Sequence, residues 1–251
     1  MVTIPIFKYK THGILNREWP QGKKIHLLEC NFSSDIEIRE FNVETEVRAD
    51  DINEARLVGR NNCYDATNLL WFSIGGKLDL DNNKEDTQEV GSSKIKAHSS
   101  LLCKSTIKNL YPITIEQLTE IENVQNNILN TNREENEILI RSIHWWALGK
   151  REKDTIHRFI KLWISLEILF EKGDKLKQVT EELSKIYPEL NQDDISNSFK
   201  PVRDYRNDII HEGLSNPSKL VEYTKKLEAI LEDILSFKLS TNIQSRAKQF
   251  F

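Results

Sequence analysis

The sequence predicts a mainly α-helical protein in two parts, a mixed α+β domain over residues 1–110 and an all-α bundle over residues 111–251. The 251 residues suit one large domain or two small ones. Glycine and proline are scarce, with 9 and 6 copies, which argues against a turn-rich all-β fold. Apolar and polar residues alternate in parts of the first hundred positions, whereas helical spacing dominates from Thr114 onward.

Short strands are expected in the N-terminal part. Lys24–Cys30 is typical of a short strand, and Ile36–Val47 alternates through much of its length, as a half-buried strand does. Another strand is predicted at Trp71–Ile74. The polar segment Asp79–Ser93 is expected to form a solvated loop or the tip of a hairpin.

Several helix starts carry capping residues. Asp50 or Asp51 suits the N-cap of a helix that follows the second strand. Thr114 and Gln117 match a capping box, in which each side chain satisfies the other residue's backbone N–H. Thr131–Glu134 offers a further helix start, so helices are expected throughout the C-terminal part.

The remaining helices follow from apolar spacing. Asp154–Phe170 is apolar on more than one face, which favours a central place in a bundle or burial by a partner chain. Leu176–Ile186 is amphipathic. Pro201 is expected to begin the next helix and Gly213 to end it, in the positions those residues favour. Leu220–Leu235 predicts a last long helix.

The overall charge argues against a generic nucleic-acid binder, because the formal net charge is −4. Basic residues nevertheless gather in two places, and each of them is more often an ordinary solvated side chain than a ligand contact. The first basic group is Arg141, Lys150, Arg151, Lys153, Arg158 and Lys161, and the second basic group is Lys200, Arg203 and Arg206.

Other classes find little support. No apolar run approaches the roughly 20 residues that span a bilayer, and the first residues lack a signal-peptide pattern, so we expect no membrane partner and a cytoplasmic location. Cys30, Cys63 and Cys103 form no CxxC pair and are expected to be reduced and mostly buried. The six histidines lack metal-ligand spacing, and no glycine-rich phosphate loop occurs, so we expect neither a metal nor a cofactor.

The most informative segment ends the helix before Gly213. On an α-helix, Asn207 and His211 share a face with Arg203, and Arg206 lies about 140° around from His211. A guanidinium matches two phosphate oxygens, and a histidine moves protons near neutral pH. The negative end of the helix dipole favours the imidazolium form of His211. These residue types suit RNA cleavage, in which the ribose 2′-hydroxyl is the nucleophile.

Two open questions accompany this reading. Arginine and histidine are also common as cations that cap a helix C-terminus, and Arg206 could pair with an acid such as Glu212. Glu167 falls among apolar residues by helical spacing, so it needs a partner, for which Arg203 and Arg206 are candidates. Equally, Glu167 could lie at a partly wet helix edge.

The C-terminal part resembles a HEPN domain, most closely the Apea-like branch. The resemblance covers about residues 114–245 and is carried by Trp146–Gly149, Phe159–Phe170 with its Leu-Trp-Ile-Ser-Leu-Glu run, and Tyr205–Gly213 with its Tyr-Arg-Asn-x-x-x-His pattern. The order and separation of the last two segments make the combination more specific than either alone. The N-terminal part resembles no family that we can name.

The resemblance implies residue roles. Arg206 would clamp the phosphate, His211 would act as general acid and base, and Asn207 would orient the phosphate or the histidine. Glu167 matches an acid of the family's Leu-Glu helix. The supporting residues would be Glu167, Arg203, Tyr205 and Asp208, and the substrate-binding residues Lys200, Arg158 and Lys161.

The implied function is a metal-independent endoribonuclease without a cofactor, a toxin or antiviral-defence effector. The family resemblance further implies a homodimer whose two Arg–His helices face each other across a cleft, with an antitoxin or defence protein as a further partner. Single-stranded RNA, such as a tRNA loop, is the expected substrate because its bases stack on aromatic residues, here Trp145, Trp146 and Tyr205. The alternative is a non-catalytic dimerisation module that senses or binds a partner protein or a nucleotide.

Overall fold

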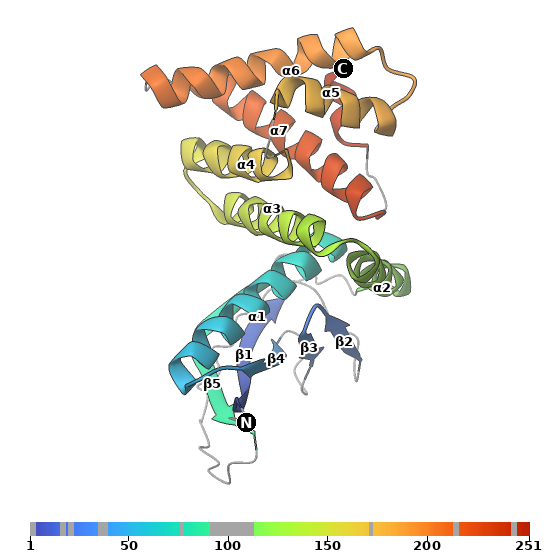
Figure 1. Ribbon diagram of the computed structural model, residues 1–251. Helices are drawn as coiled ribbons and strands as arrows, with labels where there is room; N and C mark the ends of the chain where they lie inside the picture. The colour runs from blue at the N-terminus through green and yellow to red at the C-terminus, as the bar shows by residue number, and fades with distance from the viewer. Residues whose placement is uncertain are drawn as a thin grey trace. The chain divides into compact units, whose positions relative to one another are not determined.

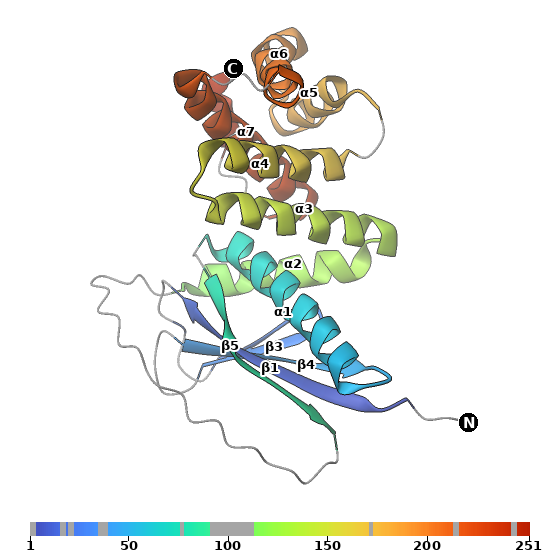
Figure 2. The ribbon, with the colours of Figure 1, turned by 90° about the vertical axis from the view of Figure 1, so that its left-hand side faces the viewer.

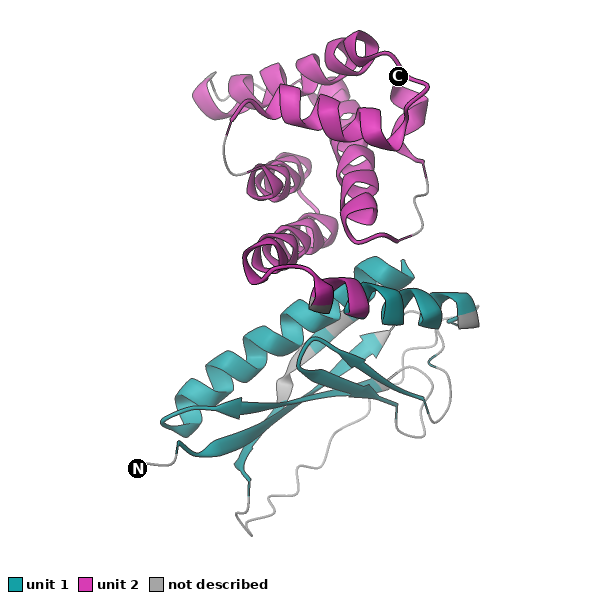
Figure 3. Ribbon diagram, turned by 45° about the vertical axis from the view of Figure 1, so that its right-hand side comes forward, with its two compact units in different colours: residues 1–125 teal, residues 126–251 magenta. Residues whose placement is uncertain are grey.

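The computed structural model describes residues 4–15, 19, 23–34, 40–75, 78–90, 113–170, 173–212, 216–241 and 245–251. The chain divides into two compact units, residues 1–125 and 126–251 (Figure 3). The division falls inside helix α2 (Ile115–Asn130), later than the expected division after residue 110. The predicted order, a mixed α+β part followed by helices, is confirmed.

The N-terminal unit contains an antiparallel five-stranded sheet with the order β2-β3-β4-β1-β5 among its described residues. Along β1, residues Phe7, Tyr9, Thr11 and Gly13 are buried and alternate with exposed or half-buried neighbours, as a sheet with one covered face requires. The strands are β1 (Ile6–Leu15), β2 (Lys24–Leu27), β3 (Cys30–Ser33), β4 (Glu40–Arg48) and β5 (Leu78–Glu89).

Helix α1 (Ile52–Ile74) lies across one face of this sheet, against β1, β4 and β5 (Figures 1 and 2). Asp51 is its N-cap and accepts hydrogen bonds from the backbone N–H groups of Asn53 and Glu54, which decides between the two predicted caps. A Cβ at Gly59 would lie 2.4 Å from the Cβ of Tyr9, so only glycine allows this close approach of helix and strand.

Three predictions for this unit are wrong. Lys24–Cys30 is not one strand, because Leu28 takes a left-handed conformation (φ 53°) and the chain turns back as a β2–β3 hairpin. Trp71–Ile74 is the last turn of α1, since a short apolar run fits a buried helix as well as a strand. Asp79–Ser93 is not a loop where it is described: β5 runs to Glu89, held by backbone pairing with β1 that its polar side chains do not reveal.

The remaining N-terminal predictions fare better. β4 matches the predicted strand from Glu40 onward, and Ile36–Arg39 lie outside the described residues. Cys30 and Cys63 are free, buried thiols with their sulfur atoms 3.9 Å apart, as expected of reduced cysteines. A hydrogen bond with Cys30, together with burial, raises the pKa of Cys63 and keeps it protonated. Cys103 lies outside the described residues.

The C-terminal unit is helical. The antiparallel helices α3 and α4 lie side by side, α7 crosses α4, and α5 lies against α6 (Figure 2). Gly149 of α3 sits against Leu162 of α4, and Ser142 and Ser165 exchange buried hydrogen bonds across the same pair. The helices are α3 (Arg133–Arg151), α4 (Thr155–Leu169), α5 (Lys175–Ile186), α6 (Gln192–Asn207) and α7 (Pro217–Lys238).

The capping predictions are confirmed. Gln117 Oε1 accepts from the Thr114 N–H, and Thr114 Oγ1 accepts from the Gln117 N–H, at 3.1 and 3.3 Å. Asn132 caps α3 through the N–H of Glu135, within the predicted start. The apolar α4 is central, since it packs against both α3 and α7. No helix among the described residues is long and apolar enough to cross a bilayer.

Helix α6 differs from its prediction at both ends. It begins at Gln192, so Pro201 lies inside it and cannot donate to the carbonyl of Asn197. Buried Ile195, Phe199 and Val202 hold the helix on both sides of this defect. At its other end α6 passes into a π-helical turn, Asp208–Glu212, and the predicted terminator Gly213 lies outside the described residues.

Candidate functional site

The predicted catalytic residues lie where α6 changes into the π turn. Arg206 and Asn207 are the last two residues of α6, and His211 lies inside the turn. A π turn joins residues five apart and contains more residues per turn than an α-helix. The predicted angle of about 140° between Arg206 and His211 assumed an α-helix. It is too large, because each residue of a π turn rotates the chain by a smaller angle, which brings residues five apart closer to one face.

Arg206 is anchored by α4. Its Nη2 donates to Glu167 Oε1 at 3.0 Å, and its guanidinium carbon lies 6.0 Å from the ring centroid of Trp163. The indole N–H of Trp163 donates to the same Glu167 oxygen at 2.8 Å. Glu167 therefore has Arg206 as its partner, while its side chain remains 36% exposed, so it lies at a partly wet edge as well.

Part of the Arg206 guanidinium remains available. Its Nη1 donates to Asn207 Oδ1 at 3.3 Å, and its Nε is buried with no hydrogen-bond partner among the described residues. Because the Nε is buried, a ligand cannot reach it here, whereas each terminal nitrogen carries a second N–H beyond the one it donates to Asn207 or Glu167. Arg206 is thus held in place by Glu167 and Trp163 and retains donor capacity for a phosphate oxygen.

His211 is exposed, as are its neighbours Asn207 and Asp208. Within the part of the chain that the structure describes, no hydrogen bond or ion pair to His211 is found. An imidazole in contact with solvent can exchange protons with a substrate as it can with water. The exposed Ile210, at 47%, lies beside His211 in the same turn.

The supporting residues have structural partners. The Tyr205 hydroxyl donates to the Asn216 carbonyl and accepts from the Asn216 N–H, at 3.0 and 2.9 Å. The Tyr205 ring packs edge-on against Phe159 and Tyr223. Arg203 does not approach Glu167 but makes two hydrogen bonds to the neighbouring Asp204. Tyr205 therefore connects the end of α6 to the start of α7 and fixes the position of Arg206.

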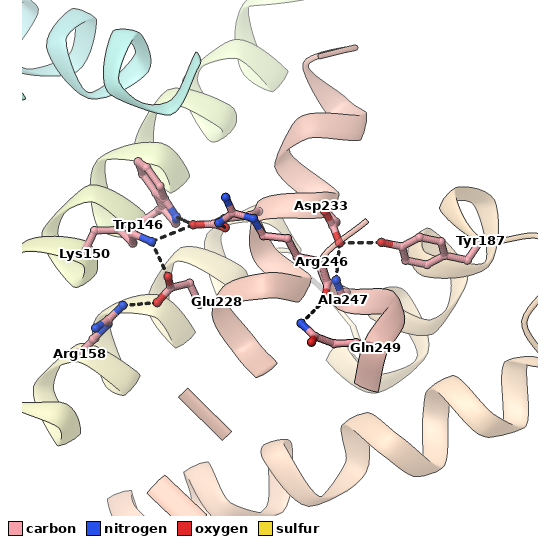
Figure 4. Close-up of polar contacts among 10 residues, drawn as sticks. Trp146, Lys150, Arg158, Tyr187, Glu228, Asp233, Arg246, Ala247 and Gln249 are labelled. Atoms are coloured by element: carbon pink, nitrogen blue, oxygen red, sulfur yellow. Dashed lines mark hydrogen bonds and ion pairs between the residues drawn. The ribbon is translucent and has the colours of Figure 1, made fainter. Parts of the chain in front are cut away.

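Two of the three predicted substrate-binding residues are engaged elsewhere. Arg158 pairs with Glu228, and Lys161 pairs with Glu152, whereas Lys200 is exposed. Figure 4 shows Arg158 and Lys150 converging on Glu228. Glu232 extends this group by accepting from Lys150 and Arg246. The acids of α7 thus neutralise the members of the first basic group that face them.

The predicted stacking residues differ in exposure. Trp146 is buried and donates its indole N–H to Glu232, and Tyr205 is buried between aromatic rings. Trp145 is half-buried. Sequence reasoning missed the role of Trp163, although its spacing of four residues from Glu167 on one helix face was a usable signal. It also missed the π turn, for which we know no sequence signal.

Among the described residues, no group of three or more histidine, cysteine, aspartate or glutamate side chains is placed to hold a metal ion. Comparison of the chain with protein-family models, with curated proteins and with solved structures finds no match. The resemblance to HEPN domains therefore rests on the sequence segments quoted above.

Proposed function

We propose that this protein is a metal-independent endoribonuclease of the HEPN type that cleaves RNA through Arg206 and His211. The observation that carries the proposal is the arrangement at the end of α6, where an anchored guanidinium with unused terminal N–H groups precedes an exposed imidazole by one wide helical turn. The two groups supply phosphate binding and proton transfer.

The proposed reaction is an internal transesterification. One His211 accepts the proton of the ribose 2′-hydroxyl as its oxygen forms a bond to phosphorus. The bond from phosphorus to the 5′-oxygen breaks, and the His211 of a second copy donates a proton to that oxygen. The products are a 2′,3′-cyclic phosphate and a free 5′-hydroxyl. Arg206 stabilises the charge that develops on the phosphoryl oxygens.

Glu167, Trp163 and Asn207 act through Arg206. Glu167 holds one terminal nitrogen and Asn207 holds the other, while the Trp163 ring lies beside the guanidinium. This arrangement fixes the plane of the guanidinium before substrate arrives, so less side-chain entropy is lost on binding. The donors that we assign to the phosphate are the second N–H groups of the two terminal nitrogens, because the Nε is buried.

The proposal includes a homodimer in which the two π turns face each other. Ile210, a large exposed aliphatic side chain beside the proposed catalytic histidine, would be covered in this dimer. The formal net charge of −4 offers weak long-range attraction of RNA. We therefore expect a short single-stranded target, such as a tRNA loop, and a cytoplasmic toxin or antiviral-defence role with a restraining partner protein.

Cleavage of total RNA by the purified protein in excess chelator tests the proposal. We expect cleavage with cyclic-phosphate ends, and a loss of about 100-fold or more for His211→Ala. His157→Ala is the matched control, because His157 is also exposed in the helical unit and its ring nitrogen lies 3.6 Å from Asp154. Absence of cleavage in wild type, or equal cleavage by wild type and His211→Ala, would contradict the proposal.

The alternative is a non-catalytic module that dimerises or binds a partner. It is favoured by the pairing of Arg206 with Glu167, which is compatible with a purely structural arginine. The substitution Ile210→Glu tests which function applies, because it places a charge in the proposed dimer interface. Leu57→Glu, at another exposed aliphatic residue, is the control. A nuclease with a composite site loses both dimer and cleavage, whereas a module shows no cleavage in any variant.

A further inference from the structure

The segment Ser245–Phe251, which we call the C-terminal strap, is held against α6, α7 and the residues that follow α5 by side chains that the proposed site does not use. The strap contains a short 3₁₀ turn, Ala247–Phe250. Ala247 is completely buried although it belongs to a short irregular segment. Ser245 enters the strap with a left-handed backbone (φ 51°), which non-glycine residues rarely adopt. The surroundings therefore determine the conformation of the strap.

Two consecutive acids of α7 bind consecutive strap residues. Glu232 accepts from the Arg246 guanidinium at 2.7 Å, and Asp233 accepts from the Ala247 N–H at 2.7 Å. Asp233 is 1% exposed, and its same oxygen accepts from the Tyr187 hydroxyl (Figure 4). A buried carboxylate needs donors, so departure of the strap leaves Asp233 short of one.

The other end of the strap meets a buried cation. The Lys226 ammonium donates to the carbonyls of Ser198 and Phe250 at 2.7 and 3.5 Å, and the Ser198 hydroxyl also donates to the Phe250 carbonyl. The rings of Phe250 and Phe251 lie 5.9 and 5.7 Å from the ammonium. These contacts recognise a carbonyl and aromatic rings at one end of the strap.

The middle of the strap completes the pattern. Lys248 pairs with Glu189 at 2.6 Å, while the hydrogen bond found for Gln249 is internal, to the Arg246 carbonyl. The contacts thus select, in order, a cation (Arg246), a small residue (Ala247), a second cation (Lys248) and, at position 250, an aromatic residue. The hydrogen bond of the intervening Gln249 stays within the strap, so position 249 is not selected. Each recognised position has its own complementary group on α6, on α7 or at Glu189 after α5.

We propose that the residues that contact the strap, namely Tyr187, Glu189, Ser198, Lys226, Glu232 and Asp233, form a peptide-recognition site for segments of the pattern Arg-Ala-Lys-x-Phe. The chain's own strap occupies this site in the structure. A tethered occupant has an effective concentration of about millimolar, so an external peptide of similar affinity competes poorly with it. When the strap leaves, the occupant that we assign to the site is the strap of a second copy of the chain, which carries the same pattern.

The test uses the full chain with its strap displaced. Ala247→Trp cannot be seated where Ala247 is completely buried. A fluorescent peptide with the sequence of residues 245–251 is added, and its anisotropy is measured. We expect binding at least tenfold tighter to Ala247→Trp than to wild type. Lys226→Met in the same background should remove this gain, and a peptide with both cations replaced by glutamate should not bind.

A second variant covers the case in which Ala247→Trp does not fold. Arg246→Glu combined with Lys248→Glu displaces the strap by charge repulsion from Glu232 and Glu189 without adding buried volume, since both side chains are about half exposed. Binding of the wild-type peptide to this folded variant supports the proposal. Helical, cooperatively unfolding variants that bind the peptide no better than wild type would overturn it.

Discussion

The two basic groups of the sequence have different surroundings in the structure. Around α3 and α4, Lys150 and Arg158 converge on Glu228, and both acids of that network are largely shielded, with Glu228 and Glu232 15% and 12% exposed at the side chain. At the end of α6, Arg206 meets one carboxylate that is 36% exposed, and the exposed His211 follows five residues later.

This difference shows that the number of cations in a segment is a poor guide to ligand binding. In the first basic group the described contacts of Lys150, Arg158 and Lys161 are with acids of the same chain, so their charges stabilise the bundle. Arg158 and Arg206 each have a buried Nε without a hydrogen-bond partner among the described residues, so an unpaired donor does not separate the two groups. The difference lies in their carboxylate partners, because Glu228 is shielded from solvent whereas Glu167 is partly exposed.

The largest difference is expected from the same substitution in each group. Arg206→Lys removes the fork that contacts Glu167 and that, in the proposed function, binds a phosphate, so RNA cleavage should fall about 100-fold. Arg158→Lys keeps a cation beside Glu228 and should leave cleavage unchanged. Initial rates on one RNA substrate measure both. Equal losses in the two variants would show that the groups do not differ in function.

The next effect concerns stability. Glu228→Gln leaves two partly buried cations without their shared carboxylate, and we expect a loss of about 2 kcal/mol in the free energy of unfolding. Glu137→Gln is the control, because its pair with Arg133 is exposed and should contribute less than about 0.5 kcal/mol. Urea unfolding measures both, and similar losses would refute the structural role of the network.

A smaller effect separates two tryptophans. Trp163→Phe and Trp146→Phe each remove one indole N–H from a carboxylate, so each should reduce stability by about 1 kcal/mol. Only Trp163→Phe should also reduce cleavage, by several-fold, because Glu167 then loses a donor that orients it toward Arg206. Parallel unfolding and cleavage measurements decide this, and equal cleavage by both variants would exclude a positioning role for Trp163.

The smallest effect is a pH dependence in the first group. The Lys161 ammonium, followed by the Asp154 backbone N–H, lowers the pKa of Glu152 to about 2 from its usual 4.5. A lowered folded-state pKa contributes stability above pH 4.5 that is lost as the pH falls toward 2. Lys161→Gln should therefore make the melting temperature less dependent on pH across that same interval. An unchanged dependence would show that this pair contributes nothing measurable.

Much of the helical part follows from local signals. The Thr114–Gln117 capping box, the cap at Asn132 and the apolar α4 all form as their residue types favour. Glu167 pairs with Arg206, one of the two cations that the sequence offers it, because a carboxylate among apolar residues requires a cation nearby. Local chemistry was sufficient in each of these cases.

Features that depend on distant partners were not predictable. The polar β5 is a strand because β1 offers backbone hydrogen bonds along its length, and Pro201 stays within α6 because buried neighbours outweigh its missing donor. The engagement of Arg158 and Lys161 depends on Glu228, far along the chain, and on Glu152 across a helix connection. The residue pattern of one sequence does not show which residues that are distant along the chain lie close together in the fold.

The Tyr205 phenol closes an interval of the chain. One hydroxyl holds both backbone groups of Asn216, eleven positions further along, so the two ends of the interval that contains Arg206 and His211 meet at a single ring. Closing an interval removes chain entropy, and Tyr205→Phe would restore that entropy by releasing both hydrogen bonds at once.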